Sequence, residues 1–221
     1  MDGEKQAPTP QEKKAEKPQK ILYSAILRVK ARLLPPEAEG EVGRLLALGR
    51  IFPIPGGGLS SWARKGNTLV KFVQKLRAKF PEEEALELLA ILYPRTQEGR
   101  LDVEACQLHF LVPPGKEPPL PAGHFRVVGL PASWPGETLD VEIHPNPNGR
   151  LRKPFTLTLH LGPGLQGQVP IPGEEEALEL RGRLDEEGRL VAEEARVVPR
   201  PPRREPSRKG KPGKGSPKAA G

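Results

Sequence analysis

One seven-residue segment, EEEALEL, occurs twice in this chain, at residues 82–88 and at residues 174–180. Each copy belongs to a longer shared order of an acidic turn, a strand, a turn with Gly-Arg-Leu at its end, and a second strand. The inner turn is three residues longer in the first copy. Self-similarity of this kind is the sequence sign of repeated structural units. The chain is therefore predicted to contain two small units of one fold, produced by an internal duplication.

Alternation of apolar and polar residues predicts β-strands in the second unit, because every second side chain of a strand points to the same face. Turn signals rich in Pro and Gly separate these runs, and 28 Pro with 24 Gly in 221 residues favour short elements. Five strands are expected, or six if residues 168–171 also pair. The five contain Phe125 and Val127; Leu139, Val141 and Ile143; Phe155, Leu157, Leu159 and Leu161; residues 177–184; and residues 189–198.

The first unit is expected to open with a strand over residues 21–34 and a second strand near residues 44–54. Its next segment, TLVKFVQKLRAKF at residues 68–80, supports two interpretations. Apolar spacing, length and residue propensities favour a helix capped by Thr68. The duplication favours a strand, because the matching place before the second EEEALEL holds QVPIP, whose prolines exclude a helix interior. We prefer the strand, so the expected fold class is all-β with some helix allowed in the first unit.

Composition divides the chain into five parts. Residues 1–20 and 200–221 have almost nothing apolar to bury and are expected to be disordered arms. Residues 114–122, which overlap the run PPGKEPPLP at residues 113–121, are expected to form a stiff linker, because proline fixes φ and removes a backbone donor. The two units then span residues 21–113 and 123–199. Each is expected to close into a small β-barrel, which removes exposed strand edges.

The ends of the two units, LELLAILYPRTQEGRLDVEACQLHFL and ALELRGRLDEEGRLVAEEARVV, resemble the last two strands of OB-fold proteins. In that family, a strand, a turn ending in glycine and a strand with small alternating residues complete a five-stranded barrel. The resemblance implies two tandem OB-like barrels, with a ligand surface on strands two and three and the loops after strands one and four. Most such barrels bind nucleic acid, and a minority bind proteins or sugars. The second unit departs from the pattern, because it is net acidic and lacks paired aromatic residues on adjacent strands.

The positive charge of the chain is concentrated in two segments. Residues 200–221 hold eight Lys or Arg against one acid, which accounts for the whole formal charge of +7. Residues 62–79 carry six Lys or Arg and no acid. A row of cations binds phosphates, because each neutralised phosphate releases condensed counterions. Both segments therefore predict contact with nucleic acid.

Aromatic side chains near these cations are candidates for base stacking. Trp62 begins the basic segment, and Tyr93 lies in the loop YPRTQEGR close to Arg95. As a strand, the basic segment would point four cations in one direction. The predicted nucleic-acid-binding residues are Trp62, Arg64, Lys65, Lys71, Lys75, Arg77, Lys79, Tyr93, Arg95, Arg203, Arg204, Arg208, Lys209, Lys211 and Lys214.

Catalytic and metal sites are not indicated by the sequence. The four histidines lack metal-ligand spacing, and the glycine run at residues 54–62 lacks the Gly-Lys-Ser/Thr ending of a phosphate-binding loop. The single cysteine, Cys106, excludes an intrachain disulfide and is expected to be a small buried hydrophobe. No enzyme activity, metal or cofactor is therefore expected. Because no signal peptide and no apolar span of about 20 residues occur, we expect a cytoplasmic protein without membrane contact.

Two functions agree with these features. The favoured one is a non-catalytic nucleic-acid-binding protein, which holds RNA or single-stranded DNA on the basic face of the first unit with help from the tail. The alternative is a protein–protein interaction or assembly module. It agrees with the unequal charge of the halves, since residues 21–120 carry 14 basic and 11 acidic side chains and residues 121–199 carry 8 and 12. The sequence does not decide the oligomeric state.

Overall fold

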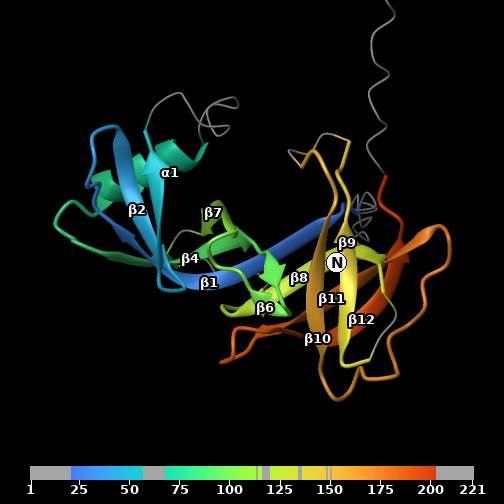
Figure 1. Ribbon diagram of the computed structural model, residues 1–221. Coiled ribbons are helices and arrows are strands. Elements are labelled where there is room, and N and C mark those ends of the chain that lie inside the picture. Colours follow the sequence, from blue (N-terminus) through green and yellow to red (C-terminus); the bar gives the residue numbers. More distant parts are fainter. Residues whose placement is uncertain are drawn as a thin grey trace, which may run out of the picture.

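Strands predominate in the structure, as the alternation of apolar residues predicts (Figure 1). The computed structural model describes residues 21–56, 68–112, 114–115, 120–133, 136–147, 149 and 151–202. The elements are β1 (Ser24–Leu34), β2 (Glu41–Ala47), β3 (Arg50–Pro55), α1 (Thr68–Lys79), β4 (Leu86–Tyr93), β5 (Thr96–Gln97), β6 (Arg100–Leu101), β7 (Gln107–Val112), β8 (His124–Pro131), β9 (Thr138–Ile143), β10 (Phe155–Leu161), β11 (Glu176–Leu184) and β12 (Leu190–Pro199). Within these residues, no helix combines the length and the apolar character needed to cross a bilayer.

The strands of the second unit close into a five-stranded β-barrel. Around the barrel the order is β8-β9-β10-β12-β11, and β11 pairs again with β8. β10 and β12 run parallel, while the other neighbours run antiparallel. Alternate side chains point inward, so that Leu139, Leu157 and Leu180 are fully buried. The predicted barrel is confirmed with five strands, because residues 168–171 contribute the buried Val169 but no sixth strand.

The first unit has the same strand order but is open at one seam. Its strands pair in the order β3-β2-β1-β4-β7, which matches the path β10-β9-β8-β11-β12 of the second unit position by position. In the second unit the two outer strands pair, whereas no pairing among the described residues joins β3 to β7. A side chain spans this seam, since Arg50 Nη1 donates to the carbonyl O of Val103 at 2.7 Å and of Glu104 at 2.6 Å. Arg50 therefore connects β3 to the segment that leads into β7.

Replacing Arg50 by methionine is expected to lower the free energy of unfolding by about 2 kcal/mol, because hydrogen bonds from a charged donor are lost. The variant keeps a long apolar side chain but removes the contacts with the carbonyls of Val103, Glu104 and Cys106. It also removes the ion pair with the Glu104 carboxylate, at 3.3 Å, and the cation–π contact with Phe52, at 4.6 Å. Urea denaturation measures the change. Arg32→Met is the control, because Arg32 is exposed and its ion pair with Glu87 is 3.8 Å long, so a loss below about 0.5 kcal/mol is expected. Equal losses in the two variants would contradict a bridging role for Arg50.

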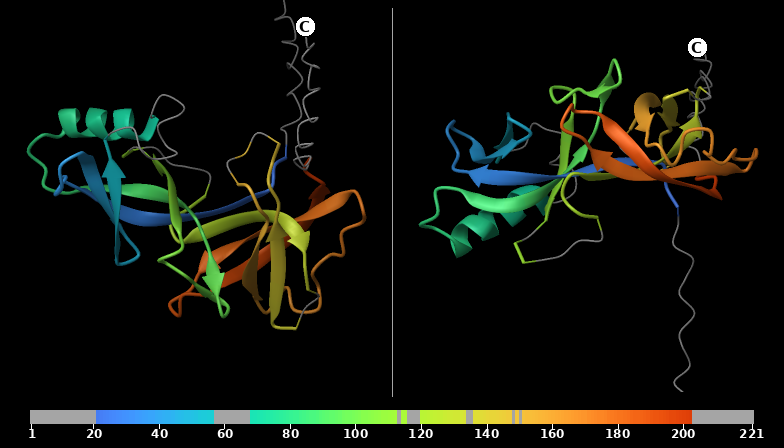
Figure 2. Two further views of the ribbon diagram at one scale, coloured as in Figure 1. Left: turned by 45° about the horizontal axis from the view of Figure 1, so that its top comes forward. Right: turned by 90° about the horizontal axis from the view of Figure 1, so that it is seen from below.

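The first strands of the two units pair with each other and join the halves into one sheet (Figure 2). Residues 24–27 of β1 lie antiparallel to residues 125–128 of β8. The later part of each strand pairs within its own unit, β1 with β2 and β8 with β9. On the opposite edge, β1 pairs with β4 and β8 pairs with β11. The two halves are therefore related by an approximate two-fold axis that passes between β1 and β8.

Residues Thr68–Lys79 form the helix α1, so the preferred strand interpretation of this segment is wrong. One side of the helix is apolar and packs into the core of the first unit. Val73 lies against Gly43 of β2, where an added Cβ atom would come within 3.3 Å of the valine side chain. The buried side chains of α1 are Leu69, Val70, Val73 and Leu76.

The repeated sequence led to a wrong prediction for residues 68–80 because the two units differ in one connection. In the second unit a series of turns joins β10 to β11, in which the N–H of Leu165 donates to the carbonyl O of Gly162 at 2.9 Å. Leu165 and Val169 are buried in the hydrophobic core. The turn thus supplies the apolar side chains that α1 supplies in the first unit. The strands are repeated, but the element between the third and fourth strands is not.

Candidate nucleic-acid interface

Three lysines form a row along the exposed side of α1: Lys71, Lys75 and Lys79. They are spaced by four residues, so each lies about 6 Å further along the helix axis than the one before. No ion pair formed by the described residues includes any of them. These lysines, called the lysine row below, share one direction as expected, although they do so on a helix and not on a strand.

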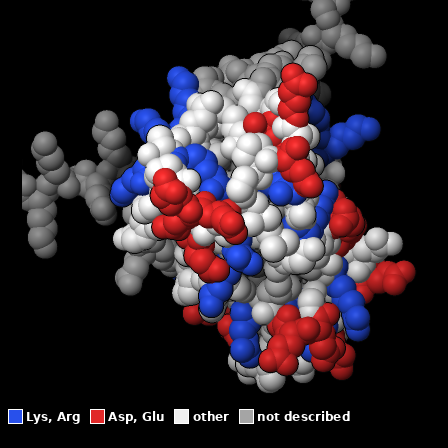
Figure 3. Space-filling view, turned by 90° about the vertical axis from the view of Figure 1, so that its left-hand side faces the viewer, with Lys and Arg blue, Asp and Glu red and all other residues white. Residues whose placement is uncertain are grey.

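The end of the molecule that carries α1 is mixed in charge. Figure 3 shows Lys and Arg side chains there in separate groups, with Asp and Glu side chains between them. The acidic turn at Glu82, Glu83 and Glu84 follows α1 directly and is exposed. Salt screens exposed charges beyond about 8 to 10 Å. The lysine row is therefore a local feature and not part of an extended positive field.

Arg77 does not belong to the lysine row. Its Nη2 donates to the carbonyl O of Leu33 in β1 at 2.8 Å, and its Nη1 donates to that of Glu83 at 2.8 Å. Burial desolvates the guanidinium and lowers the pKa of Arg77. Arg77 ties the end of α1 to β1 and to the acidic turn, whereas the sequence prediction placed it on the binding face.

Tyr93 and Arg95 lie at the end of β4 and in the loop that reaches the barrel of the second unit, not on α1. The Tyr93 ring stacks on His109, with ring centroids 4.4 Å apart. The Arg95 guanidinium lies 3.5 Å from the centroid of the Phe155 ring in β10, and burial lowers the pKa of Arg95. Both side chains contact other protein groups, so the structure does not join them to the lysine row.

The remaining predicted contacts fall outside the described residues. Arg200, the first cation of the tail, is described, and its Nη1 donates to the carbonyl O of Glu174 at 2.6 Å. The tail therefore begins beside the second acidic repeat, at the end of β12. The predicted contacts outside the described residues are Trp62, Arg64, Lys65, Arg203, Arg204, Arg208, Lys209, Lys211 and Lys214.

The surface of strands two and three, which the OB-fold resemblance implies as a ligand site, does not present a row of cations in either unit. In the second unit the hairpin β5-β6 lies on β10. The backbone N–H of Thr158 donates to Thr96 Oγ1 at 2.9 Å, and Nε2 of His160 donates to the carbonyl O of Gly99 at 3.0 Å. In the first unit, β3 exposes Ile51, which is 46% accessible. The surface is covered in one unit and largely apolar in the other.

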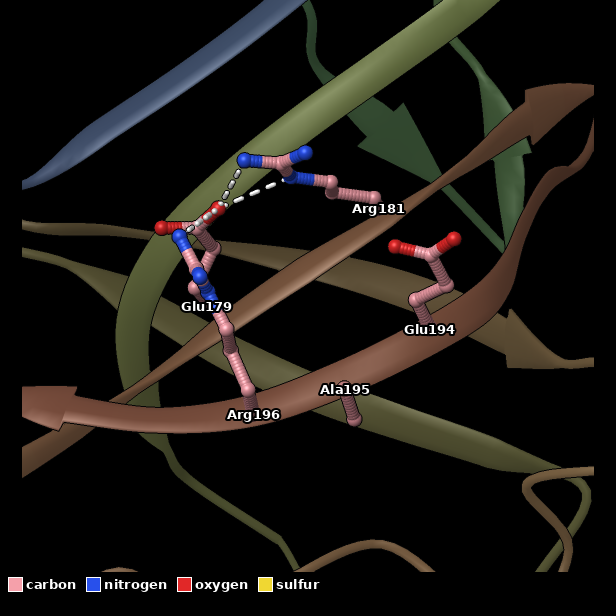
Figure 4. A pocket seen from close by; sticks show the side chains of 5 residues that line it. All are labelled: Glu179, Arg181, Glu194, Ala195 and Arg196. Atoms are coloured by element: carbon pink, nitrogen blue, oxygen red, sulfur yellow. Dashed lines mark hydrogen bonds and ion pairs between the residues drawn. The ribbon is translucent and has the colours of Figure 1, made fainter.

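A second group of cations surrounds the carboxylate of Glu179 in β11 (Figure 4). Arg126 of β8, Arg181 of β11 and Arg196 of β12 approach it with N–O distances of 2.7, 2.8 and 3.0 Å. We call Glu179 and these three arginines the arginine cluster. This cluster was not predicted from the sequence. Period-two alternation in LELRGRL places Glu179 and Arg181 on one face, but Arg126 and Arg196 reach that face only through strand pairing.

The negative charge of the arginine cluster is buried, whereas its positive charges are partly exposed. The Glu179 residue is 2% exposed, whereas the side chains of Arg126, Arg181 and Arg196 are 33%, 45% and 64% exposed. Burial alone would raise the pKa of Glu179, but hydrogen bonds from Arg126, Arg196 and Arg181 outweigh it and lower the pKa to about 2. The carboxylate is ionised at neutral pH. One buried negative charge therefore underlies three positive charges that reach the surface.

No nucleophile or metal site stands out among the described residues. Cys106 is buried, and burial raises the pKa of its thiol, which disfavours the reactive thiolate. In the described part of the chain, His, Cys, Asp and Glu side chains form no group of three or more that could hold a metal ion. The charged side chains that remain for a functional interpretation are the lysine row and the arginine cluster.

No protein-family model, curated protein or solved structure matches this chain. A five-stranded barrel is compatible with several functions. The functional interpretation therefore depends on the lysine row and the arginine cluster.

Proposed function

We propose that this protein binds RNA or single-stranded DNA without catalysing a reaction, and that the lysine row is its principal contact. The observation that carries the proposal is the row itself. Lys71, Lys75 and Lys79 are exposed at regular spacing and form no ion pair with a described acid. The Lys79 ammonium also lies 5.2 Å from the centroid of the Phe80 ring, but an exposed contact of this kind is weak. The three ammonium groups therefore suit backbone phosphates, and a flexible single strand follows a row of cations without sequence preference.

We further propose that the two units are tandem OB-like barrels flanked by disordered arms at residues 1–20 and 200–221. The shared strand order of the units supports this, as does the closed five-stranded barrel of the second unit. OB-folds commonly bind oligonucleotides, which favours nucleic acid over other polyanions. The tail, with eight Lys or Arg against one acid, adds affinity that does not depend on base sequence.

The proposal is tested with the full-length chain in which Lys71, Lys75 and Lys79 are replaced by Glu. Affinity for a fluorescent oligothymidylate, measured by anisotropy at low salt, is expected to fall about tenfold. Each lost phosphate contact on a single strand also reduces the salt dependence, so the slope of log K against log salt should become shallower by about 2. Because the tail is retained, residual binding without base preference is expected to persist.

The control carries the same change of charge at exposed cations away from α1: Arg100, Arg152 and Lys153, each replaced by Glu. Its affinity is expected to stay within about threefold of the parent, since general charge repulsion acts on both variants equally. Equal affinities and equal salt slopes for the two triple variants would reject the lysine row as the contact.

A protein partner is the second candidate, and the apolar face of β3 favours it. Ile51 is 46% exposed, and the neighbouring Pro53 and Pro55 are exposed on the same strand. Proline offers no N–H to an added strand, so side chains would make the contact. In that case Ile51→Ser would abolish capture of a partner from nuclease-treated lysate and leave oligonucleotide binding unchanged. Capture that disappears with nuclease treatment would instead support nucleic-acid binding.

A further inference from the structure

We propose that the arginine cluster is a phosphate-binding site, separate from the lysine row. Its ligand is a phosphate group, supplied either by the backbone of a bound nucleic acid or by a free phosphate anion. The inference rests on the proposed function only for the first of these two sources. The site lies on the outer face of the second barrel, where β8, β11 and β12 run side by side.

The guanidinium groups of the cluster keep donors that Glu179 does not use. Each guanidinium carries five N–H groups. Arg126 and Arg196 each contact the carboxylate through Nη2, and Arg181 does so through Nε and Nη2. All three side chains are partly exposed, and Arg181 and Arg196 line the surface hollow, which gives a ligand access to N–H groups that Glu179 does not use. A planar fork of this kind matches two oxygens of a phosphate.

Glu179 holds the arginines in place and, although it lines the same hollow, exposes only 2% of its surface there. It lies beneath them, almost fully buried, and accepts from all three. Without this carboxylate, three guanidinium groups would repel one another. With the Glu179 carboxylate present, the four residues of the cluster carry a net charge of +2, and the arginine side chains are already held in place. Ordered donors bind an anion with less loss of side-chain entropy than mobile surface lysines.

The carboxylate of Glu194 lies at this site and would repel a bound phosphate. It faces Arg181 across the β11-β12 pair and lines the same hollow with Glu179, Arg181 and Arg196 (Figure 4). Its side chain is exposed and forms no ion pair with the described arginines. A negative charge at this position opposes a bound phosphate. Removing that charge should therefore strengthen binding, whereas removing an arginine should weaken it.

The experiment titrates the full-length, ¹⁵N-labelled chain with inorganic phosphate and follows the arginine Nε–H signals by NMR. Saturable shifts are expected for Arg181 and Arg196. Arg196→Gln is expected to weaken phosphate binding about fivefold, because one charged donor fork is lost. Glu194→Gln is expected to strengthen it about threefold, because a like charge close to the ligand is removed. Since Glu194 is exposed, this second variant tests the site even if the arginine variant folds poorly.

Arg183→Gln is the matched control. Arg183 lies on the same strand and is exposed, but it pairs with Glu193 at 2.8 Å and is not part of the cluster. Its replacement should leave phosphate affinity unchanged. The absence of saturable shifts overturns the proposal, and so does an equal loss in the Arg183 and Arg196 variants. Unchanged affinity in Glu194→Gln also counts against it.

An oligothymidylate added to the same sample identifies the source of the phosphate. If it displaces inorganic phosphate from the Arg181 and Arg196 signals, the ligand is the nucleic-acid backbone. If phosphate shifts these signals but the oligonucleotide binds nowhere, the proposed function fails and a site for free phosphate stands. If the oligonucleotide binds through the lysine row while phosphate leaves the cluster signals unchanged, the proposed function stands and this inference fails.

Discussion

Gly182→Ala is expected to lower the free energy of unfolding by about 3 kcal/mol or more, because the new methyl group meets backbone atoms. Gly182 lies in β11 where the pairing with β12 shifts register. A Cβ atom at this position would overlap the carbonyl O of Val191 and lie 2.8 Å from Cα of Ala192. No side-chain rotation relieves these contacts, so β12 itself has to move. Arg196 lies on β12, so the arginine cluster should loosen as well.

Gly164→Ala is the control for this prediction, since Gly164 is exposed and has nothing within 4 Å of an added Cβ atom. A change below about 0.5 kcal/mol is expected there. Urea denaturation, followed by circular dichroism, compares the two variants. If Gly182→Ala were as stable as Gly164→Ala, close packing at the register shift would not be what holds β11 against β12.

The barrel of the second unit was predictable because its strands bury one face each. Leu139, Leu157 and Leu180 occupy alternate positions and are fully buried, so the period of two in the sequence maps directly onto the inward side. The pairing that closes the barrel was harder to predict from the sequence. The parallel pair of β10 and β12 joins strands that are separated in sequence by β11, and no local pattern specifies such a contact.

The segment of α1 was ambiguous for a physical reason. Phe72, Leu76 and Phe80 fit a period of two as well as a helical stripe. The duplication then favoured a strand, although only the strands of the two units are shared. What decides the structure is packing, because Leu69 and Val73 fill the core of the first unit from a helix. A repeat in sequence is therefore evidence for common strands and not for common connections.

Runs of like charge in the sequence predict only some of the cations that the structure groups together. The run without acids correctly indicates that Lys71, Lys75 and Lys79 face solvent together, since all three are exposed and none forms an ion pair with a described acid. It fails for Arg77, whose partners are backbone carbonyls of β1 and of the next turn. It also fails for the arginine cluster, whose members come from three strands. Positions far apart in sequence become one site only after the register is known.

Glu179→Gln is expected to lower the free energy of unfolding by about 3 kcal/mol at pH 7. This loss corresponds to the pKa of Glu179, which the three arginines lower from 4.5 to about 2, at about 1.4 kcal/mol for each pKa unit. A glutamine keeps the shape and one acceptor but not the charge. Three arginines are then left over a neutral group, so the strands that carry them repel one another.

The pH dependence of this loss is the sharper test. Because the folded pKa lies below the unfolded pKa, the stabilisation by ionised Glu179 is fully present above the unfolded value and disappears as pH falls towards the folded value. The difference between parent and variant should therefore shrink from about 3 kcal/mol at pH 7 to roughly half of that near pH 3. Glu194→Gln, at the same hollow but exposed, should show neither the loss nor the pH dependence. A difference for Glu179→Gln that stays constant from pH 7 to pH 3 would mean that packing of the side chain, and not its charge, holds the three strands together.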